Sequence, residues 1–144
     1  MQPQHIIDNI ASSYPDVVAK QSFGEIAMFY NKNNQLKNGV YFLTIKTKDG
    51  PNDFLSELNK SGGFRVNFKL SKQRYCDLFI KIPKRFEELS GFNLAKQNTL
   101  LPHPVYAWMS WACIINPTQQ RFNEIKFLID ESYEIAKINF EKRA

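Results

Sequence analysis

The residues of this chain best suited to ligand chemistry lie in one aromatic stretch that begins at His103. Pro102 and Pro104 flank the histidine, remove two backbone donors and favour an extended backbone, so they fix the position of the imidazole. An imidazole held in this way can donate a proton or contact a ligand. Tyr106 and Trp108 follow, and in a strand they would share one face. His103, Tyr106 and Trp108 are therefore candidate ligand-binding residues; the alternatives are core packing of the two rings and a structural histidine.

A second candidate site is the basic segment from Lys60 to Arg85. It carries eight lysine and arginine residues and a single acidic residue, Asp77, so its net charge is +7 in a chain whose formal net charge is +5. Such asymmetry can mark a surface that meets an anionic partner. The candidate anion-binding residues on a predicted strand and the helix after it are Arg65, Lys69, Lys72 and Arg74. They could hold the phosphates of a nucleic acid; the alternative is a solvated face.

The remaining chemistry-bearing residues do not form a recognisable catalytic or metal-binding pattern. The two cysteines, Cys76 and Cys113, form no C-x-x-C pair, and His5 and His103 are too far apart in sequence for a local metal motif. A straight strand between His103 and Cys113 would separate them by roughly 33 Å, beyond the reach of a Cys–His dyad. No glycine-rich phosphate loop is present. The sequence therefore predicts no catalytic residue, no metal and no cofactor, and it favours a binding protein over an enzyme.

The elements that must position these residues follow from hydrophobic periodicity and turn signals. The expected helices are Ile6–Tyr14, Pro51–Ser61, a short one capped by Ser71, and a long closing one with Asn116 as N-cap and Pro117 at its first position; the expected strands lie in Val17–Tyr30, broken at Gly24, and in Val40–Thr47, Phe64–Leu70 and Val105–Ile115. Residues Pro83–Leu101 are expected to form a loop with a turn of helix. This order predicts a single α+β domain over residues 1–144, with two layers: an antiparallel sheet packed by an N-terminal helix and a long C-terminal helix.

Composition sets the broad class of the protein. Its 144 residues are 43% hydrophobic and 23% charged, which is ordinary for a globular domain. No stretch approaches the roughly 20 apolar residues of a membrane span, and the N-terminus lacks the pattern of a signal peptide. We therefore expect a cytoplasmic protein without membrane contact.

Three stretches resemble a known family. The chain resembles a set of uncharacterised bacterial proteins, domain-of-unknown-function family 6194, over nearly its whole length. The stretches that carry the resemblance are Leu101–Trp111 with Ile115-Asn116-Pro117, Tyr41–Gly50 and Phe64–Asn67. That resemblance implies no established activity.

The second half is also similar, more loosely, to the YjbR/MmcQ-like fold. The resemblance rests on a strand with histidine and tryptophan that leads into a closing helix with Ser132-Tyr133-Glu134-Ile135-Ala136. It implies a YjbR-like fold, and since members of that group have been proposed to bind DNA, it implies DNA as one partner. This is analogy at the level of fold.

Two functional hypotheses follow. The first is a non-enzymatic binding module that uses the open face of the sheet and its basic flank, with nucleic acid or another anionic molecule as a possible partner. The alternative is a small-molecule-binding protein or enzyme with a pocket near His103, Tyr106 and Trp108.

Overall fold

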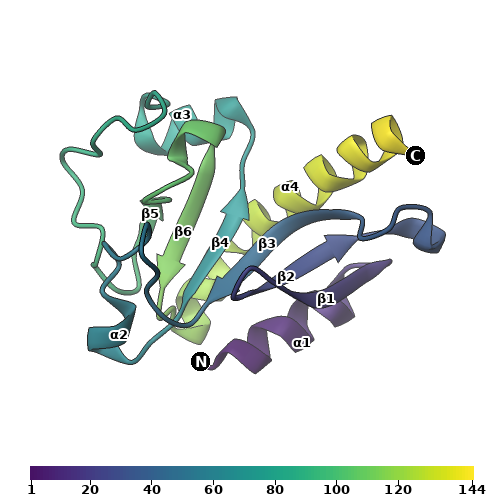
Figure 1. The fold of residues 1–144 in the computed structure, drawn as a ribbon, viewed down its shortest axis with the longest axis horizontal. Coiled ribbons are helices and arrows are strands. Elements are labelled where there is room, and N and C mark those ends of the chain that lie inside the picture. Colours follow the sequence, from purple (N-terminus) through teal and green to yellow (C-terminus); the bar gives the residue numbers. More distant parts are fainter.

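The computed structural model describes residues 1–144 and contains one six-stranded antiparallel sheet (Figure 1). The strands are β1 (Val17–Ser22), β2 (Glu25–Tyr30), β3 (Val40–Lys46), β4 (Arg65–Lys69), β5 (Leu100–Pro102) and β6 (Trp111–Ile115), in the order β1-β2-β3-β4-β6-β5. The helices are α1 (Pro3–Ser13), α2 (Leu58–Ser61), α3 (Lys72–Phe79) and α4 (Gln119–Arg143), with 3₁₀ turns η1 (Lys32–Asn34) and η2 (Ala107–Met109). The predicted α+β class, N-terminal helix and long C-terminal helix are confirmed.

The first three strands form the predicted antiparallel meander, and the chain reverses between β1 and β2 at the predicted break, Gly24. Phe23 and Gly24, with φ angles of 51° and 79°, form the two-residue turn between β1 and β2, and Ser22 pairs with Glu25 across it. Positive φ at both turn residues is what a tight hairpin with the normal strand twist requires. The turn therefore brings Glu25 to the start of β2, at the end of the sheet where the candidate site lies.

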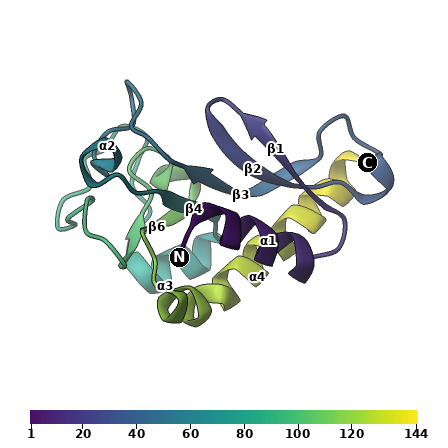
Figure 2. The same cartoon turned by 90° about the horizontal axis from the view of Figure 1, so that it is seen from below.

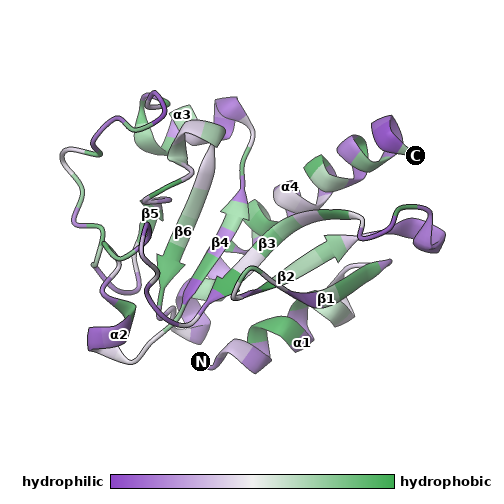
Figure 3. Cartoon of the chain, viewed as in Figure 1, coloured by the Kyte–Doolittle hydropathy of each residue, from purple (hydrophilic) through white to green (hydrophobic).

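Helices α1, α3 and α4 lie on one side of the sheet (Figure 2). Their apolar side chains and those of the strands form one cluster of 24 buried residues, which includes Ile6 of α1, Tyr75 of α3 and Phe122 of α4. Figure 3 shows the hydrophobic residues concentrated along β2 and β6, whereas hydrophobic and hydrophilic residues alternate along β4 and α4. This pattern is expected for a sheet buried on one face and a helix that shows its other face to water.

The opposite face of the sheet is covered over only part of its width. Leu58 of α2 packs on Leu101, Cys113 and Ile115, so a small second core covers β5 and β6. Over β2 and β3 no helix lies on this face (Figure 2). The sheet face predicted to be open is therefore covered over β5 and β6 and open over β2 and β3.

No helix combines the length and the apolar character that a membrane span requires.

The predicted strand Val105–Ile115 is wrong in its first half. Residues Ala107–Met109 form η2, Ser110 has a left-handed φ of 67°, and the strand begins only at Trp111. The side chain of His103 accepts hydrogen bonds from the next backbone amides and so tightens the chain into a turn. Tyr106 and Trp108 therefore do not share a strand face. Leu100–Pro102, at the end of the predicted loop, is a strand instead and pairs with β6.

Two predicted helix starts are also displaced. The helix expected from Pro51 begins at Leu58, because the Asp49 carboxylate accepts from the amides of Leu58 and Asn59 and caps the helix there. The closing helix has Thr118 as its N-cap, and its hydroxyl accepts from the amide of Arg121.

The side chain of Asn116, the N-cap expected from the sequence, is used elsewhere. It accepts from the amide of Phe64, at the start of β4. At the starts of both α2 and α4, a hydrogen bond between residues distant in sequence changes which residue caps the helix, and the local sequence does not show such a bond. The cap predicted for α3 is confirmed, since Ser71 accepts from the amide of Arg74.

Candidate functional site

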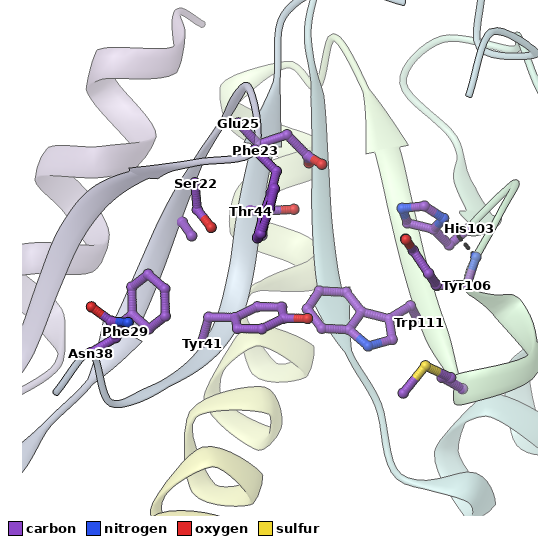
Figure 4. Close-up of a pocket in the computed structure, with 12 residues that line it drawn as sticks. Ser22, Phe23, Glu25, Phe29, Asn38, Tyr41, Thr44, His103, Tyr106 and Trp111 are labelled. Carbon is purple, nitrogen blue, oxygen red and sulfur yellow. Dashed lines mark hydrogen bonds between the residues drawn. The ribbon is translucent and has the colours of Figure 1, made fainter. Parts of the chain in front are cut away.

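A groove of about 390 Å³ lies on the open part of the sheet, between the β1–β2 turn and the segment from His103 to Met109 (Figure 4). Aromatic rings line much of it. The rings of Tyr41 and Trp111 lie 5.7 Å apart with planes tilted by 34°, and Phe29 meets Tyr41 edge-on at 5.7 Å. Phe23 at the hairpin turn and Met109 on η2, both exposed, form the rim. Such walls suit a flat apolar ligand.

Polar groups converge on the same groove. Glu25 from β2, Thr44 from β3, and His103 and Tyr106 from the segment between β5 and β6 all line it. In Figure 4 the Glu25 carboxylate and the Thr44 hydroxyl lie on the side of the groove near the hairpin turn. The His103 imidazole and the Tyr106 hydroxyl lie on the side opposite them. A few convergent polar groups among apolar walls are typical of a small-molecule site.

His103 is held by the backbone on both sides. Its amide donates to the carbonyl of Trp111 at 3.0 Å, and its Nδ1 accepts from the amides of Val105 and Tyr106, both at 3.0 Å. Because Nδ1 accepts, the proton of the neutral ring must be on Nε2. Burial, and next the positive charge of Arg65, hold the pKa of His103 well below its usual value. At neutral pH the site therefore contains an uncharged imidazole with an Nε2–H donor.

Arg65 lies beneath this histidine, fully buried on β4. Its guanidinium forms a two-pronged ion pair with Asp53, with Nη1 to Oδ1 at 2.8 Å and Nη2 to Oδ2 at 2.6 Å. Nη1 also donates to Ser56, at 2.8 Å, and Nε donates to the Asn67 side-chain oxygen, at 2.6 Å. Nη2 lies 3.3 Å from Nε2 of His103. The charge of Arg65 is thus neutralised inside the protein, as a buried charge requires.

Asn67 connects this buried network to the groove. Its amide nitrogen donates to Thr44 Oγ1 at 3.0 Å and to Glu25 Oε1 at 3.3 Å. Thr44 pairs with Asn67 across β3 and β4, and Asn67 pairs with Cys113 across β4 and β6. Sheet register therefore lines up the polar groups that run from Glu25 to His103.

The structure brings together two of the three predicted ligand-binding residues. His103 and Tyr106 share the groove and their rings are 5.2 Å apart. Trp108 lies outside it, on η2, in a second cleft of about 590 Å³ that Tyr106 also lines. There the guanidinium of Arg85 lies 5.0 Å from the Trp108 ring and 5.0 Å from the ring of Phe86.

The four predicted anion-binding residues do not gather on one surface. Arg65 is buried against Asp53. Lys69 donates to the backbone carbonyl of Met109. Lys72 is exposed in the first turn of α3, and Arg74 is paired with Glu131 of α4, at 2.8 Å.

The separation expected between His103 and Cys113 is wrong, because the chain folds back between them. Leu101 of β5 lies opposite Cys113 of β6, and the thiol contacts the carbonyl of Pro102 at 3.7 Å. Burial raises the pKa of Cys113 to about 12, so the side chain is a thiol at neutral pH. Cys113 is thus a buried weak donor near the groove.

Sequence reasoning missed Glu25, Tyr41 and Thr44 as groove residues. They come from the meander, far in sequence from His103, and no local pattern distinguishes them from ordinary strand residues. In a straight strand Trp111 would lie on the face opposite Tyr106 and Trp108, but the turn at Ser110 brings its ring into the groove.

A family model described as "Family of unknown function (DUF6194)" matches residues 1–144. No curated protein and no solved structure matches the chain.

Proposed function

The chain belongs to the family of unknown function DUF6194, and we propose that it binds a small molecule in the groove on the open face of its sheet. One observation carries this proposal. The buried Nε2–H of His103 has no acceptor within the protein, and it belongs to an aromatic groove. A buried donor without a partner costs free energy, so its position in a groove is explained if an entering molecule supplies the acceptor.

The two tryptophans make this proposal testable. Trp108 lies outside the groove and Trp111 inside it, so Trp108→Phe leaves Trp111 as the only tryptophan. We would titrate this variant with small planar aromatic fragments and follow the emission of Trp111. Fragments that enter the groove should change that emission and raise the melting temperature.

Removal of one aromatic wall provides the matched comparison. Tyr41→Ala in the same background should weaken fragment binding by about tenfold or more, since a stacked ring contributes on the order of 1–3 kcal/mol with its buried area. Ile138→Ala, at an exposed position on α4, is the control and should leave binding unchanged. If no fragment changes the emission of Trp111 at any soluble concentration, the proposal is wrong.

A second candidate function, nucleic-acid binding, is supported by the cleft at Trp108. Arg85 lies over the rings of Trp108 and Phe86, the ring of Phe86 is exposed, and Lys84 lines the same cleft. Rings that alternate with cations are typical of surfaces that stack bases and hold phosphates. The basic flank would thus act through Lys84 and Arg85.

We further propose that the protein is bacterial and cytoplasmic and that its fold is YjbR-like. The bacterial source and the fold are supported by the sequence resemblances, among them the Ser132–Ala136 pattern, which lies in α4.

A further inference from the structure

We propose that the ligand of the groove is a small, neutral, planar carboxamide or lactam, whose carbonyl oxygen is bound by His103 and Arg65 and whose N–H is bound by Glu25. This inference rests on the proposed function and adds the chemical class of the ligand. It follows from the donors and acceptors that the groove leaves unmatched, from the balance of charge around it and from the shape of its walls.

A count of the hydrogens around Arg65 shows a missing acceptor. The guanidinium has five N–H groups, and four of them point at Asp53, Ser56 and Asn67. The fifth, on Nη2, faces Nε2 of His103 at 3.3 Å. Nε2 also carries a hydrogen, because Nδ1 accepts from two backbone amides. The Nε2–H of His103 and the fifth N–H of Arg65 therefore face each other, and neither hydrogen has an acceptor of its own.

An oxygen atom from a ligand would satisfy this pair. Both side chains are buried, with exposed fractions of 0% for Arg65 and 3% for His103, and buried donors almost always have acceptors. His103 lines the groove, whereas Arg65 lies behind it. A carbonyl oxygen that enters the groove therefore meets Nε2–H first and takes a share of the free Nη2–H.

The other polar end of the groove requires a donor. Glu25 accepts through Oε1 from Asn67 at 3.3 Å, and its Oε2 has no protein partner. A carboxylate has about four acceptor sites, and the protein fills one of those of Glu25, a residue that lines the groove. An N–H on the ligand satisfies it, while Asn67 keeps the carboxylate in place.

The charges around the groove favour a neutral ligand. Arg65 and Asp53 cancel each other as an ion pair, and Glu25 is the acidic side chain that lines the groove. A ligand carboxylate would gain from Arg65 but would be repelled by Glu25, and a cationic ligand would meet the opposite problem. A carbonyl beside an N–H satisfies both ends without adding charge.

The walls select a flat molecule. The tilt of 34° between Tyr41 and Trp111 and the edge of Phe29 leave ring faces and edges for a planar ring to contact. An aromatic carboxamide is flat across both the ring and the polar group. Its oxygen and its N–H point away from one carbon in different directions, so a single amide can turn its acceptor to His103 and its donor to Glu25.

Three probes of one shape test the class of ligand. Benzamide has an acceptor and a donor, benzoate has two acceptors and a negative charge, and benzamidinium has two donors and a positive charge. We would titrate each into the full chain carrying Trp108→Phe and follow Trp111. Benzamide should bind at least about tenfold more tightly than either charged probe, which corresponds to about 1.4 kcal/mol.

Two variants assign the contacts. His103→Asn places Oδ1 where Nδ1 accepts from the amides of Val105 and Tyr106, so it preserves the turn and removes Nε2–H; benzamide should weaken by about tenfold. Glu25→Gln removes the charge and keeps the shape, so benzoate should gain on benzamide. The inference would be overturned if the chain without these two changes bound benzoate or benzamidinium more tightly than benzamide. It would also be overturned if neither His103→Asn nor Glu25→Gln changed the affinities of the probes.

The failure of this inference is distinguishable from the failure of the proposed function. If other planar fragments change the emission of Trp111 but benzamide shows no preference, the groove binds small molecules and the assigned class is wrong. If nothing binds, water fills the space beside His103 and both proposals fail.

Discussion

Arg65 is the residue on which the interior of the site depends. It is fully buried, and Asp53 is its only ionic partner. Burial alone would raise the pKa of Asp53, but the hydrogen bonds and charge of Arg65 lower it below its usual value. Because Asp53 stays ionised, the guanidinium is compensated at neutral pH. Loss of this partner leaves a buried positive charge, which is far more costly than the ion pair is favourable.

We therefore predict that Asp53→Ala destabilises the protein by roughly 3–5 kcal/mol, measured by urea unfolding. Glu131→Ala removes the partner of Arg74 in a half-exposed ion pair and should cost far less, at most about 1 kcal/mol. Similar losses in both variants would show that Arg65 is not the compensated buried charge described above.

His103 should make stability depend on pH. Its folded-state pKa lies well below its usual 6.5, so below about pH 6.5 the unfolded chain takes up a proton that the folded chain does not. Stability is therefore unaffected by His103 above pH 6.5 and falls as the pH drops below it. Between about pH 7 and about pH 5.5 the loss should be about 1 kcal/mol.

His103→Asn should remove this part of the pH dependence, in paired urea titrations at the two pH values. His5→Gln changes the other histidine of the chain and serves as the control. An unchanged difference between the two pH values in His103→Asn would contradict the buried neutral imidazole.

At the scale of elements, sequence patterns sufficed where an element depends on its own residues. The alternation in Phe64–Leu70 predicted β4, and Ser71 predicted the cap of α3. They failed where a distant partner decides the outcome. β5 is three residues long and exists because it pairs with β6, and Asn116 is drawn away from capping α4 by the amide of Phe64.

The start of α4 gives a direct test at this scale. Thr118 caps the helix by accepting from the amide of Arg121 at 3.1 Å, so Thr118→Ala should cost about 1 kcal/mol of unfolding free energy. Thr118→Ser keeps the hydroxyl and should cost much less. A loss for the serine variant as large as for the alanine variant would show that the cap contributes little and that the methyl group matters more.

The groove itself exists only at the scale of the whole molecule. Glu25, Thr44 and Asn67 come from the neighbouring strands β2, β3 and β4. Trp111 comes from β6 and His103 from the segment after β5, towards the other edge of the same sheet. The sequence predicted His103 from the two prolines beside it and Tyr106 from the aromatic stretch that follows. It could not predict that Arg65, expected on a basic surface, would turn inward, because that depends on Asp53 reaching it from the loop before α2.

The basic residues are likewise arranged by the whole fold, and this distinguishes two ways of binding nucleic acid. If the cleft at Trp108 binds single-stranded DNA by stacking and phosphate contacts, Lys84→Gln with Arg85→Gln should abolish anisotropy changes of a labelled strand at low salt. Lys69→Gln with Arg74→Gln removes the same charge, but Lys69 donates to Met109 and Arg74 is paired with Glu131, so binding should persist.

Phosphate contacts also require the affinity for DNA to fall steeply as the salt concentration rises. Equal losses in both double variants would indicate attraction to net charge alone, and no binding by the unmodified chain at low salt would eliminate nucleic acid as a partner of this surface.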